Sequence, residues 1–335
     1  MSSDLYGAVQ GDGVDAGVAW HYGDPLREQR RLATAAGTVD RSHRAVLVVG
    51  GADRLGWLHS ICSQHVRDLT DGDCTESLVL SPHGHVEQHW QVTELGGSVW
   101  IDTEPGRGDE VLGYLQKMRF LKRVEPADVS TDWAVVSLVG PSIATVLAAA
   151  GLPVPSPRRA AALPGGGFVR RMPGPGADAA DILVPRSTVG ATLAMLSAAG
   201  AEAAGLWAYE ALRVEARLPR LGFETDHRTI AHEVGWIGSA VHLDKGCYRG
   251  QETVARVQNL GRPPRRLVLL HLAGESDVLP GHGTAVEAGG RSVGFLGTAL
   301  HHHELGPIAL AVIKRSLPDD AQLSVAGAEV SIDPG

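Results

Sequence analysis

Hydrophobic residues in the first third of the chain recur at helical spacing in some segments and alternate as in strands in others. In the segment 53–66, Leu55, Leu58, Ile61 and Cys62 fall on one helical face, and Asp53 is a residue type that favours a helix N-cap. The same criteria predict helices at 27–36, 53–66 and 110–119 and strands at 45–49, 76–81, 85–94 and 99–102.

A second group of elements follows, and then the pattern changes. It predicts strands at 133–138 and 181–184 and helices at 143–149, 187–199 and 205–218. This irregular order favours an α+β fold over a doubly wound sheet. After the proline pair at 263–264, apolar runs alternate with glycine turns, which predicts a small C-terminal β-barrel. The expected domains are an irregular segment 1–25, an α+β region 26–260 with a break near 125–132, and a barrel 261–335.

Composition limits the compartment and the partners. The 335 residues are 44% hydrophobic and carry a net charge of −8, so no global field would attract nucleic acid. We therefore expect no sequence-specific nucleic-acid binding. We also expect no membrane span and no targeting segment, because long apolar runs and a basic leader are missing. The three cysteines are odd in number and far apart, which fits a reducing cytoplasm without a disulfide framework or a protein-held metal cluster.

The stretch from 245 to 252 contains the most conspicuous chemistry. Its residues are Lys245, Gly246, Cys247, Tyr248, Arg249, Gly250, Gln251 and Glu252. A cation on either side of a cysteine favours the thiolate, which is the reactive form, and glycines allow the sharp turn that exposes a side chain. Taken alone, the pattern is also compatible with a small packing cysteine in a tight turn.

This stretch, written K-G-C-Y-x-G-Q-E, resembles the signature of YgfZ-type folate-binding proteins. They are a branch of the superfamily of the glycine-cleavage T-protein, an aminomethyltransferase. The resemblance extends over about 30–315 and includes the segments 47–53, 80–84 and 212–219. It implies a T-protein-like ring of ferredoxin-like α+β subdomains, a tetrahydrofolate site in the region 26–260, and a role with iron–sulfur proteins.

Glu215 is the second candidate site residue. On the helix 205–218 it follows Ala208, Ala211 and Leu212 at spacings of three and four, which predicts a carboxylate on an apolar face. Such a group needs a partner. The resemblance implies that Glu215 binds the pterin, with Arg213 and Arg256 as further cofactor-binding residues. A structural ion pair with Arg228 or Arg256 is the alternative for Glu215.

Several other features have an ordinary structural interpretation. The cluster of Arg256, Arg262, Arg265 and Arg266 fits either a folate glutamate tail or scaffolding between domains. The acidic segment 222–226 fits either substrate contact or a solvated turn. The three histidines at 301–303 are expected at a hairpin end rather than in a metal site, because successive strand residues point to opposite faces. Cys62 and Cys74 are expected in the core.

One segment departs from the pattern of the transferase. The resemblance leads us to expect an aspartate shortly after the glycine turn at Gly84, but Gln88 and His89 occupy the acidic positions. Glu87 and His89 share one strand face, so a pair between them is one possible substitute.

Our leading hypothesis is a cytoplasmic, tetrahydrofolate-binding protein that assists iron–sulfur protein assembly or repair, with indirect effects on tRNA modification. Its partners would be folate and iron–sulfur assembly proteins or client enzymes. Cys247 and Lys245 would form the reactive centre, with Tyr248 and Gln251 framing the loop. A folate-dependent one-carbon transferase or demethylase is the alternative. A scaffold that has lost its ligand is the third possibility.

Overall fold

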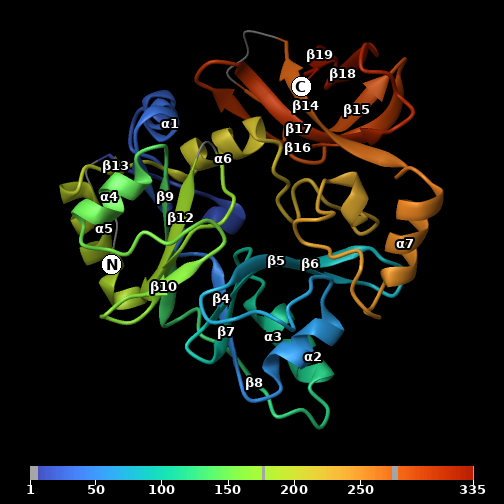
Figure 1. The fold of residues 1–335 in the computed structure, drawn as a ribbon. Coiled ribbons are helices and arrows are strands. Elements are labelled where there is room, and N and C mark those ends of the chain that lie inside the picture. Colours follow the sequence, from blue (N-terminus) through green and yellow to red (C-terminus); the bar gives the residue numbers. More distant parts are fainter. Residues whose placement is uncertain (1–6, 176–177, 274–277, 335) are drawn as a thin grey trace.

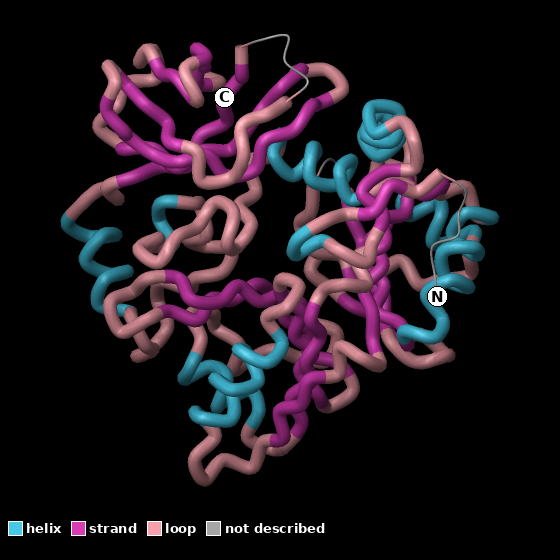
Figure 2. Tube along the Cα trace, turned by 180° about the vertical axis from the view of Figure 1, so that it is seen from behind, coloured by secondary structure: helices cyan, strands magenta, loops and turns pink. Residues whose placement is uncertain are grey.

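Three β-rich units surround a central loop segment in the computed structural model, which describes residues 7–175, 178–273 and 278–334 (Figure 1). The first is a five-stranded sheet, the second a six-stranded sheet, and the third a closed barrel. Seen from behind, the barrel and the two sheets again lie around the same centre (Figure 2). The mixed α+β architecture with a C-terminal barrel is therefore confirmed.

The five-stranded sheet has the order β5-β6-β7-β4-β8 and antiparallel pairing throughout. Its strands are β4 (Ala45–Gly50), β5 (Cys74–Leu80), β6 (Val86–Leu95), β7 (Ser98–Thr103) and β8 (Glu125–Asp128). Helices α2 (Arg54–Ile61) and α3 (Gly108–Met118) pack against it, with Leu58 and Leu115 in a shared core. Because side chains alternate along β6, its odd-numbered positions 87–91 lie on the face away from that core.

The six-stranded sheet has the order β10-β11-β12-β9-β3-β13. Its strands are β3 (Gly37–Asp40), β9 (Trp133–Val139), β10 (Ala160–Ala162), β11 (Phe168–Arg170), β12 (Ala179–Pro185) and β13 (Glu202–Ala203). Helices α4 (Ile143–Ala149) and α5 (Val189–Ala198) pack with it around Val136 and Ile182. The chain crosses to the other sheet between β3 and β4, so the segment 41–44 lies between the two sheets.

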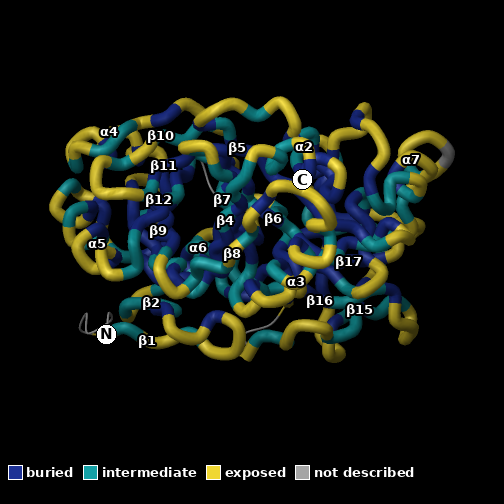
Figure 3. The backbone as a smooth tube through the Cα atoms, turned by 90° about the horizontal axis from the view of Figure 1, so that it is seen from below, coloured by how far each residue is buried: buried dark blue, intermediate teal, exposed yellow. Residues whose placement is uncertain are grey.

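The barrel closes in the order β14-β17-β16-β15-β18-β19. Its strands are β14 (Arg265–Leu272), β15 (Ala285–Ala288), β16 (Arg291–His302), β17 (Gly306–Lys314), β18 (Leu323–Val325) and β19 (Ala328–Ile332). The three histidines lie where β16 turns into β17, as expected for a hairpin end. Seen from below, strands β9 and β17 are largely buried while exposed backbone lies mainly at the periphery (Figure 3).

Helix α6 (Leu206–Glu215) joins the six-stranded sheet to the barrel. Leu206 and Leu212 pack with Val39 of β3, whereas Ala211 and Val214 pack with barrel residues. The two apolar faces hold α6 between the units and direct Glu210 and Arg213 away from both cores. The helix ends at Glu215, and Arg217 two residues later has a φ of 54°.

The N-terminal segment, expected to be irregular over 1–25, contains short elements in its described part. They are β1 (Val9–Gln10), the 3-10 turn η1 (Gly13–Asp15) and β2 (Ala19–His21). Residues 1–6 lie outside the described residues. Helix α1 (Pro25–Thr34) follows, and Asp24 caps it by accepting a hydrogen bond from the Arg27 backbone N–H at 2.9 Å.

The expected helices were wrong at two places. The helix expected over 53–66 ends at Ile61, because Cys62 is extended and the carbonyls at the helix end bind a lysine ammonium. Helix α7 (Gln251–Leu260) was not expected, since its first residues belong to the stretch interpreted as a loop. Gly250, which precedes α7, has a φ of 82°, a conformation that favours glycine. Among the described residues, no helix is long and apolar enough to cross a membrane.

Candidate functional site: a charged cavity and an exposed thiol loop

A cavity of about 310 Å³ lies between the two sheets, helix α6 and the loop that follows it. The described residues that line it combine arginines, carboxylates and aromatic rings. The polar and aromatic ones are Arg41, His43, Arg44, Glu76, His89, Gln91, Glu104, Arg158, Asp181, Tyr209, Glu210, Arg213, Arg217, Arg220, Trp236 and Ser239. Six arginines against four carboxylates among these described residues leave an excess of positive charge.

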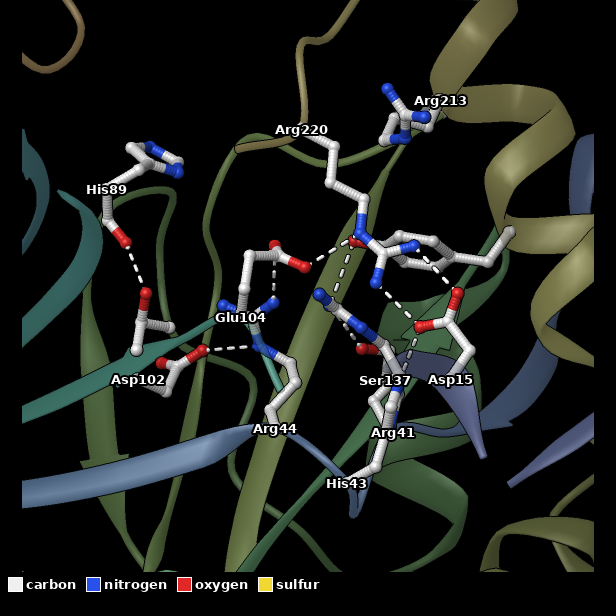
Figure 4. A network of polar contacts seen from close by, with 12 residues as sticks. Asp15, Arg41, His43, Arg44, His89, Asp102, Glu104, Ser137, Arg213 and Arg220 are labelled. Carbon is white, nitrogen blue, oxygen red and sulfur yellow. Dashed lines mark hydrogen bonds and ion pairs between the residues drawn. The ribbon is translucent and has the colours of Figure 1, made fainter. Parts of the chain in front are cut away.

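Arg220 lies at one side of the cavity and joins three separate chain segments. Its guanidinium binds Asp15 of η1 at 2.6 Å and Glu104, just after β7, at 2.7 Å (Figure 4). Asp15 also contacts His43 Nε2 at 3.0 Å. The N-terminal segment is thereby fixed against the cavity wall by a buried ion pair.

A second series of ion pairs continues along the wall. Arg44 binds Glu104 at 3.1 Å and Asp102 at 2.8 Å. Arg170 binds Asp102 at 2.6 Å and Asp181 of β12 at 2.8 Å, so the charges of the two sheets alternate in sign. Buried charges are tolerated only when they are paired in this way.

The alternating charges keep the cavity acids ionised. Burial alone would raise the pKa of Asp181, but Arg170 and Arg41 lower it to about 2. Burial likewise opposes ionisation of Glu104, yet Arg220 and Arg44 hold its pKa well below the usual range. These two carboxylates therefore stay ionised near neutral pH.

Helix α6 contributes Glu210, whose carboxylate is only partly used by the protein. Glu210 Oε2 accepts hydrogen bonds from Arg213 Nε at 2.9 Å and Nη2 at 2.8 Å. Its Oε1 has no hydrogen-bond partner among the described residues. A carboxylate oxygen that lines a cavity and has no donor is a place for a ligand N–H.

Arg213 connects this acid to the barrel. Besides Glu210 it binds Glu224 at 3.0 Å and donates to Thr298 Oγ1 of β16 at 2.6 Å. Glu224 is fully buried and accepts from the Thr298 backbone N–H at 2.8 Å. Arg213 is thus a structural link that fixes Glu210.

Aromatic rings form the flat surfaces of the cavity. His89 stacks on Trp236 with ring centroids 4.7 Å apart and an interplanar angle of 23°. The Arg41 guanidinium lies 4.3 Å from the Tyr209 ring centroid. His89 Nε2 lies 2.9 Å from Glu76 Oε2 of β5. A flat, nitrogen-rich ligand would find both stacking surfaces and acceptors here.

The amino-acid sequence of this chain is similar to those of known proteins. Residues 5–158 match the family model of the GCVT N-terminal domain. The aminomethyltransferase of Geobacillus kaustophilus is 28% identical over 91% of this chain and 85% of its own length. The chain is thus similar over most of its length to this aminomethyltransferase. A putative chloroplastic transferase of Arabidopsis thaliana is 25% identical over 77% of this chain and 60% of its own length.

The fold of the chain agrees with that of a solved structure. The glycine cleavage system aminomethyltransferase T of Bartonella henselae superposes with a TM-score of 0.86. It covers 97% of this chain and 93% of the other, at 21% identity. The expected T-protein-like fold is therefore confirmed. The assignment to the YgfZ branch stays a prediction, and so does the site that it implies.

Cys247, the candidate reactive thiol, is exposed, whereas Cys62 and Cys74 are buried as expected for core thiols. None of the residues 245–252, all described, lines the cavity. The thiol loop and the cavity are thus separate features, which the sequence stretch alone did not reveal.

Lys245 anchors this loop to the end of helix α2. Its buried ammonium donates to the carbonyl oxygens of His59, Cys62 and Gln64 at 2.6, 2.7 and 2.8 Å. Burial lowers the pKa of Lys245 to about 8, while the three carbonyls favour the charged form. These contacts give Lys245 a structural role, and its expected action on the Cys247 thiol stays a prediction.

The rest of the stretch is also held by specific contacts. Arg249 pairs with Glu87 of β6 at 3.0 Å, and Gln251 donates to the Lys245 carbonyl oxygen at 3.1 Å. Tyr248 is buried, and Glu252 is exposed in the first turn of α7. Lys245, Tyr248 and Gln251 therefore lie on the inner side of the loop.

The expected burial of Glu215 was wrong. Its side chain is 43% exposed, and its carboxylate lies 3.4 Å from His302 Nε2 rather than in the cavity. Helix α6 has two apolar faces, which pack against two different units. The spacing that placed Glu215 with Ala211 therefore did not identify the face that lines the cavity. The acid of α6 that lines the cavity is Glu210, which the sequence reasoning passed over.

The expected cofactor-binding arginines occupy different positions. Arg213 lines the cavity, but Arg256 is exposed on α7 and does not. In the cluster near the barrel, Arg265 binds Asp226 and Glu233, each at 2.7 Å. Arg265 therefore links the barrel to the preceding loop and neutralises Asp226 of the acidic segment 222–226.

The strand without the expected aspartate presents a histidine to the cavity. Gln88 is buried on the core side of β6, and His89 lies on the opposite side. Glu87 pairs with Arg249, so the possible Glu87–His89 pair does not form. His89 instead takes Glu76 as its partner.

Sequence reasoning missed several cavity residues because their partners are distant in the chain. Asp15 and Arg220 are one example, and Trp236 with His89 is another. A local signal exists only for Glu210, which precedes Arg213 by one helical turn and forms an ion pair with it.

Proposed function

We propose that this protein binds a reduced folate in its cavity and assists the assembly or repair of iron–sulfur proteins through the Cys247 loop. The observation that carries the folate part is the unpartnered Glu210 Oε1 in a polar, aromatic cavity of about 310 Å³. Sequence similarity to an aminomethyltransferase over most of the chain supports it. The volume is at the lower end of the range for small-molecule sites.

A folate matches the cavity in shape and charge. Its pterin is flat and presents adjacent N–H donors, which suit a carboxylate oxygen such as Glu210 Oε1. Stacking surfaces are available at Trp236 and His89. The glutamate tail is anionic, and Arg158 lines the cavity without an ion pair among the described residues.

The iron–sulfur part rests on the thiol loop. Cys247 is exposed on a loop that Lys245 and Arg249 attach to two different elements of the five-stranded sheet unit. A thiol held outward on a fixed loop is suited to contact another protein. Because it lies outside the cavity lining, a folate and a client protein can be bound at the same time.

Calorimetry with tetrahydrofolate tests the folate part, since a scaffold that lost its ligand would show no heat of binding. The iron–sulfur part is tested in cells that lack this chain, by measuring the activity of iron–sulfur enzymes such as those of tRNA thiolation. Reduced activity that the wild-type chain restores supports the proposal. Unchanged activity in those cells rejects it.

A one-carbon transferase is the second candidate, favoured by the Glu76–His89 pair in the cavity. That pair offers acid–base chemistry on the strand where the transferase pattern has an acid. Formation of methylene-tetrahydrofolate from tetrahydrofolate and an S-aminomethyl thiol donor would favour this function over the first.

A further inference from the structure

His89 and Glu76 face the cavity from neighbouring antiparallel strands. His89 pairs with Leu78 in the β5–β6 ladder and Glu76 pairs with Gln91, so the two are diagonal neighbours on one sheet face. Their side chains are 13% and 12% exposed, respectively, and both line the cavity. The two residues therefore form a pair built into the sheet rather than a chance contact of surface side chains.

The contact fixes which ring nitrogen of His89 carries a proton. Glu76 is ionised: burial would raise the pKa of its carboxyl group, but the hydrogen bond from His89 and the nearby charges, which include Arg158 and Arg170, together lower it. An ionised carboxylate only accepts hydrogen bonds, so Nε2 of the neutral ring carries the proton and donates at 2.9 Å. The other nitrogen, Nδ1, is then an acceptor, and it has no partner among the described residues.

One face of the ring is also covered, because Trp236 stacks on it with the ring centroids 4.7 Å apart. A fixed imidazole with one nitrogen on a carboxylate and the other unpaired is the arrangement that positions a base. Here that arrangement opens on the cavity that contains Glu210.

The geometry points to His89 Nδ1 as the proton-accepting group of this cavity, with Glu76 as its positioning residue, for a ligand that presents an amine N–H. This inference rests on the proposed function, since a reduced folate carries secondary amines in its ring. In the step, a protonated ligand nitrogen gives its proton to Nδ1 and keeps the electron pair of the broken N–H bond, so the ligand becomes the neutral amine. The imidazolium keeps its Nε2–H bond to Glu76, and no oxidant or further reactant is required.

The first test needs no ligand. Nitrogen-15 NMR of histidine-labelled protein reports which ring nitrogen bears hydrogen, with His89→Phe identifying the resonances. We expect neutral His89 to be protonated at Nε2 alone in the wild type. In Glu76→Gln the amide can donate to Nε2, so a population protonated at Nδ1 should appear with the fold intact. A wild-type ring protonated at Nδ1, or a tautomer unaffected by Glu76→Gln, overturns the inference.

The second test uses tetrahydrofolate and separates the two proposals. His89→Phe keeps an aromatic ring on Trp236 but removes the acceptor. We expect it to bind tetrahydrofolate about 5-fold to 10-fold more weakly, the effect of one lost hydrogen bond. His83→Asn, an exposed histidine outside the cavity, is the control. Wild-type binding with unchanged affinity in His89→Phe overturns the role of His89 but leaves the folate proposal. If the wild type does not bind, the folate proposal fails, and the tautomer measurement still decides the role of His89.

Discussion

Arg220 forms a buried ion pair with Asp15, which lies 205 positions earlier in the chain, at 2.6 Å. The pair closes the wall of the cavity, because Arg220 also binds Glu104 of the five-stranded sheet unit. The N-terminal segment is consequently part of the site, although its sequence is rich in glycine and aspartate and carries no periodic pattern. Removing either partner would leave the other buried charge with fewer compensating contacts.

We predict that Asp15→Asn lowers the free energy of unfolding by about 3 kcal/mol, because the buried guanidinium of Arg220 loses one of its charged partners. Urea denaturation measures this change. Asp12→Asn, at an exposed residue of the same segment whose side chain caps no helix, should change stability by less than about 0.5 kcal/mol. Equal effects of the two variants would mean that the Asp15 pair does not hold the segment.

We predict that Asp181 supports stability above pH 3.8 and loses this effect as the pH falls. Its pKa in the folded protein is about 2, below the ordinary value of 3.8, so the unfolded chain binds more protons between these values. The contribution is about 2 kcal/mol at neutral pH. In Asp181→Asn, stability measured by urea denaturation should be lower at pH 7 and should fall less between pH 4 and pH 2. Asp132→Asn, an exposed acid, should behave as the wild type.

We predict that Lys245→Met releases the thiol loop from helix α2. The variant removes an ammonium that serves three carbonyl oxygens, and the expected loss of stability is about 2 kcal/mol. Hydrogen exchange of the backbone amides at 245–250 should be faster in the variant than in the wild type, whereas exchange in the core strands should stay the same. Lys122→Met, at an exposed lysine, is the matched control. Unchanged exchange at 245–250 would show that the carbonyl contacts do not anchor the loop.

We predict that Cys247→Ala folds normally but fails to restore iron–sulfur enzyme activity in cells that lack the chain. The thiol is exposed and packs in no core, so stability should change by less than about 0.5 kcal/mol. Glu252→Ala, a nearby exposed change, should restore activity. Full restoration by Cys247→Ala removes the thiol from the proposed mechanism.

The elements of the core could be predicted from the sequence because their signals are local. The alternation along β6 and the helical spacing in α3 identify buried faces without knowledge of their partners. The same applies to the barrel strands, where glycine turns separate apolar runs. Helix α7 was missed because Gly246 and Gly250 suggested a loop, although only the segment before Gln251 is one.

The candidate site was predicted less well, because its geometry depends on long-range contacts. The exposure of Cys247 followed from its glycine neighbours, but the anchoring of Lys245 under α2 has no signal in the stretch. Helix α6 packs on two units, so periodicity alone did not separate Glu210 from Glu215. Which acid faces a cavity is decided by the elements that surround the helix.

The most direct test of the account is a calorimetric titration of the wild type, Glu210→Gln and Glu215→Gln with tetrahydrofolate. Glu210 lines the cavity with an unpartnered oxygen, and Glu215 is 43% exposed outside it. We predict binding by the wild type, at least 10-fold weaker binding by Glu210→Gln, because a charged acceptor is lost, and nearly unchanged binding by Glu215→Gln. No binding by the wild type, or a loss confined to Glu215→Gln, would contradict the account.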